Sequence, residues 1–202
     1  MKVLQECNGA KRIGIGGHVR PDGDCIGSCL ALFQYLSKCL DESVCIKVYL
    51  EQPAPKFKEL KGFDNIVSDF PEEESFDVFF VLDCNLERLG EGQKYFNKAK
   101  KTINIDHHIS NCGCADVNYV VPTIGSTSEI IYDLIVGEAG LHLDPPHALP
   151  SIVTWKPKTP FAHESSSGSP HTLKKQCRLK AKGIVHKYCT VVGKFFLYKR
   201  MN

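Results

Sequence analysis

Carboxylates and histidines follow three separate apolar runs of this sequence, at the points where those runs stop. Aspartate oxygen and imidazole nitrogen together suit Mn²⁺, Mg²⁺ or Zn²⁺. Carboxylates this dense repel one another unless a cation neutralises them. Two divalent ions within about 4 Å of each other need a bridging carboxylate and can activate water for attack on a phosphoester. The residues lie in GHVRPDGD (His18, Asp22, Asp24), FDVFFVLD (Asp83) and KTINIDHH (Asp106, His107, His108).

Each segment also has an ordinary structural interpretation when it is taken alone. The stretch 22–24 has the composition of a turn, Asp83 could cap a strand end, and adjacent histidines are often structural. Arg88 could be a surface charge on a helix. Three independent strand ends of this kind favour a shared site over coincidence. Because no serine or cysteine nucleophile stands there with an adjacent base, activated water is the expected attacker.

Strand-like and helix-like segments alternate along the first 140 residues and must position these side chains. Apolar strand patterns cover 11–18, 43–50, 76–83, 101–108 and 117–121. Helical periods are found from Ile26 onward, over 88–101 and over 125–140. At the start of the last segment, Ser126 as N-cap and Glu129 three residues later form a capping box. This order predicts an α/β fold, a doubly wound and mainly parallel sheet flanked by helices. Ligands of such sheets bind outside the carboxyl ends of the strands.

The composition is that of an ordinary globular protein. The chain has 202 residues, of which 43% are hydrophobic and 24% are charged. It contains no apolar run of about 18 residues and no signal-peptide pattern, so we expect a cytoplasmic protein without a membrane span. The ten cysteines lie mostly in apolar segments and are expected to be reduced thiols.

Charge divides the chain into two parts. Residues 1–144 carry 14 basic and 22 acidic side chains, a net −8, whereas residues 145–202 carry 11 basic side chains and one acid, a net +10. The second part is rich in Pro, Ser and Lys, and its periodicity is weak. We therefore expect one domain over 1–144 and an aberrant basic tail over 145–202, poorly ordered or partly helical. A basic tail can also contact RNA.

The motifs resemble those of the DHH phosphoesterases, in order and in spacing. GHVRPDGDCIGS is similar to the first motif, VLDCNLERLG to the second, NIDHH to the third and GSTSE to a further signature. The likeness is most specific to the subgroup of bifunctional oligoribonucleases and 3′-phosphoadenosine 5′-phosphate phosphatases, which is related to RecJ-type exonucleases. It extends from about Lys11 to Asp144.

The resemblance implies a role for each residue of the cluster. Two Mn²⁺ ions are implied, with Mg²⁺ as a possible substitute, and a metal-activated water would attack phosphorus in line. Asp106 would orient His107 without itself binding metal, and His108 and Arg88 would contact the substrate phosphate. The implied metal ligands are His18 and Asp22 for one ion, Asp24 and His107 for the other, and Asp83 as the bridge.

The resemblance breaks after residue 144. The family has a strand ending in Thr-Asp-Thr-Gly, whose aspartate is a further ligand, and here Trp155 stands in its place. A C-terminal DHHA1 domain is also expected in the family and is missing from these 202 residues. We interpret the tail as a disrupted or truncated reading frame and expect weak or no turnover from this chain.

Three functions remain open from the sequence. The first is a Mn²⁺-dependent phosphoesterase that hydrolyses short oligoribonucleotides or 3′-phosphoadenosine 5′-phosphate, a possible homodimer. The second is a non-catalytic fragment that binds metal or RNA. The third is a zinc-binding regulator that uses Cys112, Cys114 and nearby histidines, although this cysteine spacing is poor for zinc. The choice among oligoribonucleotide, nucleoside bisphosphate and cyclic dinucleotide is not encoded in these residues.

Overall fold

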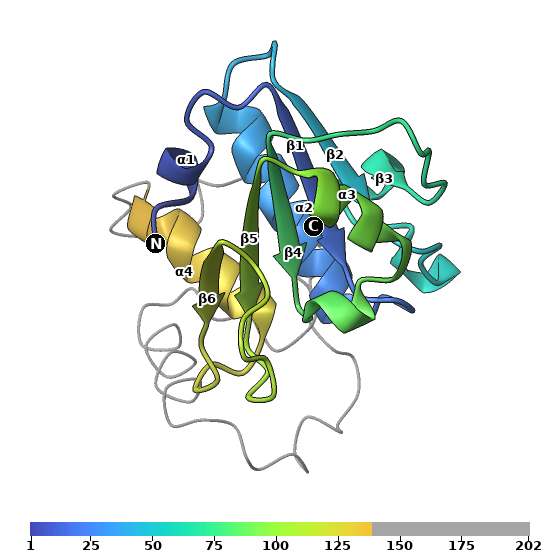
Figure 1. The fold of residues 1–202 in the computed structure, drawn as a ribbon. Helices are drawn as coiled ribbons and strands as arrows, with labels where there is room; N and C mark the ends of the chain where they lie inside the picture. Colours follow the sequence, from blue (N-terminus) through green and yellow to red (C-terminus); the bar gives the residue numbers. More distant parts are fainter. Residues whose placement is uncertain (139–202) are drawn as a thin grey trace, which may run out of the picture.

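A six-stranded sheet forms the centre of residues 1–138, the part of the chain that the computed structural model describes (Figure 1). The strand order is β3-β2-β1-β4-β5-β6, and every pair of neighbours is parallel. The bounds are β1 (Arg12–Gly17), β2 (Cys45–Tyr49), β3 (Ile66–Val67), β4 (Val78–Leu82), β5 (Lys101–Asp106) and β6 (Val117–Val120). The predicted doubly wound parallel α/β fold is therefore confirmed.

Helices cover both faces of the sheet. On one face α2 (Gly23–Cys39) packs against α4 (Thr127–Glu138) and against β1 and β2, and α1 (Val3–Glu6) contacts α4. On the other face the short helix α3 (Gln93–Lys98) packs on β4. Four 3₁₀ turns lie in the connections: Pro55–Phe57, Phe63–Asn65, Leu86–Arg88 and Gly90–Gly92.

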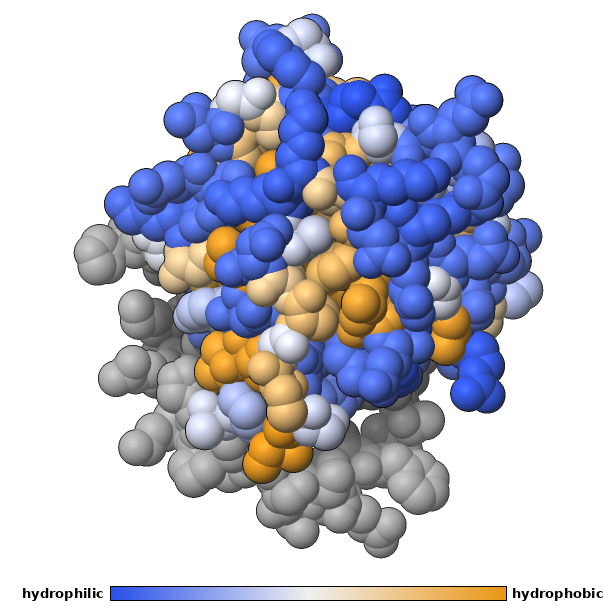
Figure 2. Space-filling view, in the orientation of Figure 1, coloured by the Kyte–Doolittle hydropathy of each residue, from blue (hydrophilic) through white to orange (hydrophobic). Residues whose placement is uncertain are grey.

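The two faces of the sheet bury different kinds of side chain. The face under α2 and α4 is aliphatic, and Ile13 and Ile15 of β1 point into it. The other face is aromatic, with Phe79 and Tyr95 near its centre. On that side β1 has glycines, because a Cβ on Gly14 would lie 2.3 Å from Cδ2 of Phe79. On the side of the molecule seen in Figure 2, hydrophilic residues cover the upper and right-hand parts of the surface, and apolar residues are visible along its middle and lower part.

Most of the predicted elements are present, and the differences have local causes. The helix predicted over 88–101 is a pair of 3₁₀ turns followed by the six-residue α3, because Gly90 takes a left-handed φ of +60°. The strand predicted over 101–108 ends at Asp106, whose carboxylate accepts the backbone N–H groups of His107 and His108 and turns the chain. The two-residue β3 and the one-turn α1 were not predicted, because each is too short to show a period.

Several further predictions can be compared with residues 1–138. Ser126 does cap α4, since its Oγ accepts the backbone N–H of Glu129 at 3.2 Å. All eight cysteines within residues 1–138 are free thiols, as predicted. None of the helices among the described residues is long and apolar enough to cross a membrane. The predicted basic tail, 145–202, lies outside the described residues.

Candidate metal centre

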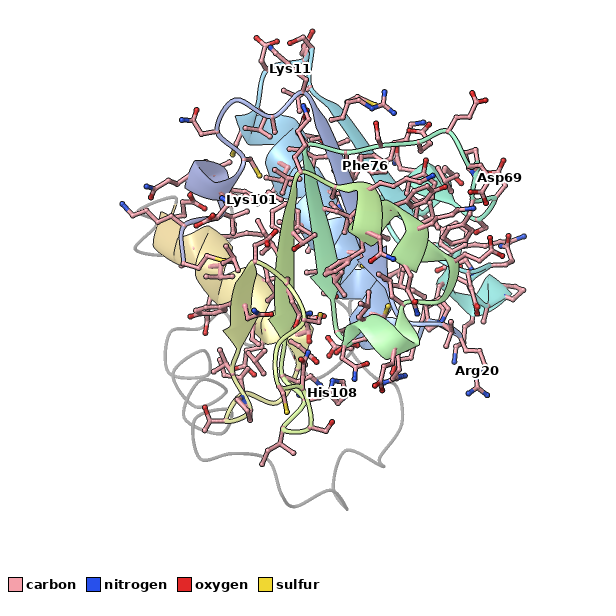
Figure 3. All side chains as sticks on the ribbon, viewed as in Figure 1. Lys11, Arg20, Asp69, Phe76, Lys101 and His108 are labelled. Carbon is pink, nitrogen blue, oxygen red and sulfur yellow. The ribbon has the colours of Figure 1, made fainter. Side chains whose placement is uncertain are left out.

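The predicted site residues meet at the carboxyl end of the sheet. Lys11 and Lys101 mark the opposite end, where β1 and β5 begin, and His108 lies just beyond the end of β5 (Figure 3). The strand order reverses between β1 and β4, because the chain leaves β1 towards β2 and leaves β4 towards β5. Ligand sites of doubly wound sheets lie at this switch point. The three strands that carry the predicted residues, β1, β4 and β5, are adjacent there.

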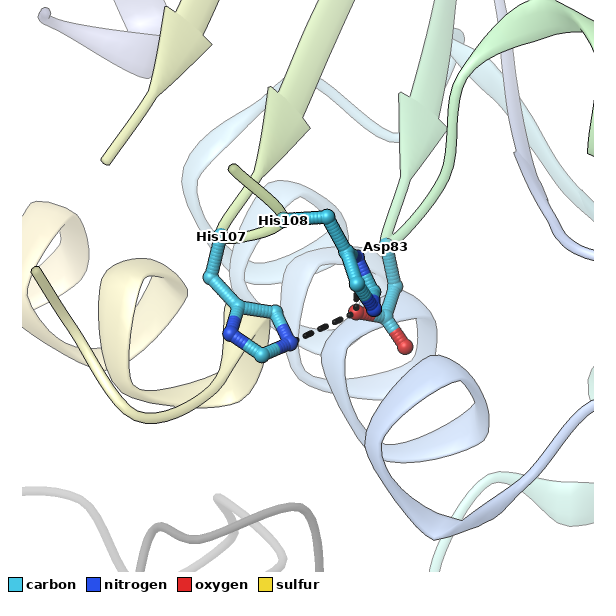
Figure 4. Close-up of side chains that lie close together, drawn as sticks. All are labelled: Asp83, His107 and His108. Carbon is cyan, nitrogen blue, oxygen red and sulfur yellow. Dashed lines mark ion pairs between the residues drawn. The ribbon is translucent and has the colours of Figure 1, made fainter. Parts of the chain in front are cut away.

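Asp83 lies at the centre of the cluster and presents its two carboxylate oxygens to different histidines. Oδ2 is 3.6 Å from Nε2 of His18, and Oδ1 is 3.6 Å from Nε2 of His107 (Figure 4). The side chain is only 3% exposed. The backbone of Asp83 is left-handed, with φ of +62°, a conformation that costs about 1–3 kcal/mol for a residue other than glycine. This turn directs the carboxylate across the strand ends, between His18 and His107.

His18 and Asp22 form one side of the cluster. Nδ1 of His18 donates to the backbone carbonyl of Val19 at 2.8 Å, so Nε2 faces Asp83 and lies 3.8 Å from Oδ1 of Asp22. Burial opposes protonation of His18, but the Asp22 and Asp83 carboxylates raise its pKa to about 12. The same contact with His18 holds the pKa of Asp22 down at about 2. Asp22 also caps α2, since its Oδ1 accepts the backbone N–H groups of Asp24 and Cys25.

Asp24 and His107 form the other side. Oδ2 of Asp24 lies 3.7 Å from Nε2 of His107. Both oxygens of Asp24 also accept backbone N–H groups at the start of α4, from Thr127 and Ser128, each at 2.9 Å. Burial, followed by the charge of Asp83, raises the pKa of the Asp24 carboxyl well above its ordinary value. Asp24 therefore joins α2 to α4 at the edge of the site.

The structure corrects the pairing of Asp106. The resemblance implies that Asp106 orients His107, but its carboxylate contacts the ring of the next residue instead. Oδ1 of Asp106 accepts from Nδ1 of His108 at 2.7 Å, and its link to His107 is through the backbone N–H alone. The reason is the tight turn after β5, which folds the His108 ring back over Asp106. The His108 side chain stays 39% exposed.

The other predicted residues stand at the border of the cluster. Arg88 is exposed, and its backbone carbonyl accepts from Val19, which follows His18. Ser126 and Glu129 are buried at the start of α4, where they build the end of the helix that meets Asp24. Two groups within residues 1–138 bring possible metal-ligand atoms within 4.8 Å of one another, and neither includes a cysteine: His18 with Asp22 and Asp83, and Asp83 with His107 and His108.

The contacts of this cluster fit divalent cations. Within residues 1–138, the ion-pair partners of its aspartates are histidines, with no Lys or Arg among them. The Nε2 atoms of His18 and His107 lie 3.6–3.8 Å from carboxylate oxygens, too far for hydrogen bonds. Atoms bound to one ion at about 2.1 Å are separated by roughly 3–4 Å. Carboxylate oxygens and imidazole nitrogens at this spacing form a donor set that suits Mn²⁺, Mg²⁺ or Zn²⁺.

Four residues that support the cluster were not predicted. Thr127 donates from Oγ1 to Oδ1 of Asp83 at 2.8 Å, and Ser128 donates from Oγ to the carbonyl of Asp24. Asn104 and Asn111 form a buried amide pair below the Asp106 turn. The hydroxyls of GSTSE and the two amides of INIDHHISN were a visible signal, because polar side chains inside buried segments need partners.

Thr127 gives a test of this support. Replacing Thr127 with valine removes the donor to Asp83 without changing the size of the side chain much, and we expect an affinity for Mn²⁺ that is lower by 10- to 100-fold. Thr102→Val is the matched control, because Thr102 is also buried and donates to Asp116 at 2.8 Å, at the opposite end of β5. Urea denaturation should show that the free energy of unfolding falls by about 1–2 kcal/mol in each variant. Equal losses of Mn²⁺ affinity in the two variants would show that Thr127 has no special part in the site.

The fold and this cluster together define an α/β protein with a candidate metal-ligand site at the switch point of its sheet. The chain belongs to the DHH family, because the model of the DHH family N-terminal domain matches residues 12–153. The phosphoesterase lineage predicted from the four motifs is thereby confirmed.

Two proteins, one compared by sequence and one by structure, are similar to this chain. The chain is 32% identical over 120 residues to the bifunctional oligoribonuclease and PAP phosphatase NrnA of Bacillus subtilis, covering 58% of this chain and 36% of that protein. It also resembles the crystal structure of an exopolyphosphatase-related protein from Bacteroides fragilis, with a TM-score of 0.60, 28% identity, and coverage of 67% of this chain and 42% of that one. This chain thus spans well under half of either relative.

Proposed function

We propose that this chain carries the metal centre of a Mn²⁺-dependent phosphoesterase that hydrolyses short oligoribonucleotides or 3′-phosphoadenosine 5′-phosphate. The observation that carries the proposal is Asp83, whose two oxygens face His18 on one side and His107 on the other. The likeness to NrnA, whose name gives both activities, supports this choice of substrates. The chain spans 36% of that relative, so the activity is proposed for the protein to which this domain contributes.

Different residues of the cluster would bind the cations and the substrate phosphate. His18 and Asp22 would hold one cation, Asp24 and His107 the other, and Asp83 both. Divalent cations held there would supply a water of lowered pKa and offset negative charge on the phosphoryl group. Asp106 fixes the ring of His108 through Nδ1, so Nε2 of His108 is proposed to lie towards the substrate phosphate. Arg88, exposed beside the site, is proposed to attract the same phosphate.

The experiment that tests the proposal measures hydrolysis with Mn²⁺ present and absent, on this chain and on an extended version that carries the Thr-Asp-Thr-Gly strand and the DHHA1 domain of the family. The substrates are a three-residue oligoribonucleotide, 3′-phosphoadenosine 5′-phosphate and a cyclic dinucleotide. Mn²⁺-dependent release of product from the first two supports the proposal. Tight binding of Mn²⁺ with no hydrolysis of any substrate by either version would instead favour a non-catalytic metal-binding domain, and cleavage of the cyclic dinucleotide alone would overturn the substrate assignment.

A further inference from the structure

A buried pair of asparagine side chains connects the ends of β4 and β5 directly below the cluster. Asn111 donates from Nδ2 to Oδ1 of Asn104 at 2.8 Å and to Oδ2 of Asp106 at 2.7 Å. Asn104 in turn donates from Nδ2 to the carbonyl of Cys84 at 2.8 Å. Asn104 is fully buried and Asn111 is 8% exposed. Such buried amides are costly unless their hydrogen bonds are made, and here both are engaged.

The pair reaches the residue after Asp83. The Cys84 carbonyl accepts from Asn104 and, at 3.3 Å, also from Asn111. These bonds anchor the turn in which Asp83 holds its left-handed backbone, and the N–H of Asp83 donates to Ile105 on β5. The strand that bears Asp83 and the turn that bears the histidines are therefore tied together by side-chain amides.

Asn111 also completes the surroundings of the Asp106 carboxylate. Oδ1 of Asp106 accepts from the backbone of His107 and from the backbone and ring of His108, and Oδ2 accepts from Asn111. Asn111 itself is fixed, because its Oδ1 accepts the N–H of Gly113 at 2.9 Å. If the Asn111 amide is removed, Oδ2 loses this partner, and the carboxylate can rotate away from the His108 ring.

We infer that Asn111 is a positioning residue, which acts through Asp106 to hold the ring of His108 in place, with its Nδ1 towards Asp106 and its Nε2 towards the substrate phosphate. A carboxylate is only an acceptor, so the 2.7 Å contact requires the proton on Nδ1. The inference deepens the proposed phosphoesterase function and rests on it for the role of His108 alone. The hydrogen-bond chain from Asn111 to the His108 ring stands independently of any activity.

The first test reads the His108 ring and needs no turnover. In metal-free protein at a fixed alkaline pH, a long-range ¹H–¹⁵N spectrum should show the Nδ1–H form of His108. Asn111→Ala and the isosteric Asn111→Asp should each give a mixture of the two neutral forms. Asn118→Ala is the matched control, because Asn118 makes three hydrogen bonds in the same loop without touching Asp106, and it should leave His108 unchanged. An unchanged His108 in both Asn111 variants overturns the inference, whatever the activity proves to be.

The second test is a double-mutant cycle on turnover. Asn111→Ala is expected to lower kcat by about 10- to 100-fold with KM changed less than threefold. The reason is that a misplaced catalytic group weakens stabilisation of the transition state more than binding of the substrate. In a His108→Ala background the same substitution should lower kcat by less than threefold, because the group through which Asn111 acts is gone. Full additivity of the two losses contradicts the inference. The cycle is measured in the extended version of the chain, where absence of turnover counts against the proposed function and leaves the spectroscopic result to decide on Asn111.

Discussion

Asp83→Asn is expected to abolish tight binding of both Mn²⁺ ions and, in the extended version of the chain, to lower kcat/KM by at least about 1,000-fold. The Asp83 carboxylate presents one oxygen to each half of the cluster, so loss of its charge affects both ions at once. Asparagine has nearly the same shape and tolerates the left-handed backbone found there. The variant should therefore fold, which separates loss of the site from loss of the protein.

Calorimetric titration with Mn²⁺ and a hydrolysis assay measure this prediction. Asp69→Ala is the control, since Asp69 is an exposed aspartate far from His108 (Figure 3), and it should bind and turn over as the unsubstituted chain does. Retention of one ion by Asp83→Asn would show that Asp83 serves a single ion. Retention of both ions would remove Asp83 from the centre altogether.

Gly17→Ala should give the largest loss of stability among conservative substitutions near the site. A Cβ on Gly17 would lie 2.3 Å from Sγ of Cys25 and 3.0 Å from Cδ2 of Leu50, both buried. Overpacking of this kind costs about 1–3 kcal/mol. Because Gly17 precedes His18 and Cys25 follows Asp24, relief of the clash moves two ligands apart, and Mn²⁺ affinity should fall as well.

The clash can also be removed by truncating Cys25, whose Sγ is the atom that the new Cβ would meet. The double variant Gly17→Ala/Cys25→Ala lacks the sulfur atom. Its loss of unfolding free energy, measured by urea denaturation, should be smaller than the sum of the losses in the two single variants. Gly137→Ala is the control, because a Cβ on Gly137 meets nothing within 4 Å on the exposed side of α4, and it should be neutral or stabilising by up to about 1 kcal/mol. Additive losses in the double variant would show that the contact between Cβ and Sγ is not the cause.

The fold and the members of the cluster could be predicted because each rests on a local pattern. The alternation of apolar strands with amphipathic helices specifies a doubly wound sheet, and such a sheet brings its carboxyl ends together. His18, Asp83 and His107 could be placed at one edge for that reason, although 65 residues separate the first two. Ser126 could be recognised as a cap from its own neighbours in the chain.

The missed contacts depend on how side chains turn at the strand ends. The pairing of Asp106 with His108 follows from the tight turn after β5, which no period in the sequence encodes. Thr127 meets Asp83 only because α4 packs on α2, which brings together residues 44 positions apart. Long-range hydrogen bonds of this kind are set by packing, so a sequence pattern names the candidates without pairing them.

The most direct test of the central claim is the electron paramagnetic resonance spectrum of the protein loaded with two equivalents of Mn²⁺. If Asp83 bridges two ions, they must lie close enough for exchange coupling, and the spectrum should show the closely spaced hyperfine lines of a coupled pair. Asp83→Asn should lose that signal. A spectrum of isolated Mn²⁺, with six lines and one ion per chain, would contradict a two-metal centre built on Asp83.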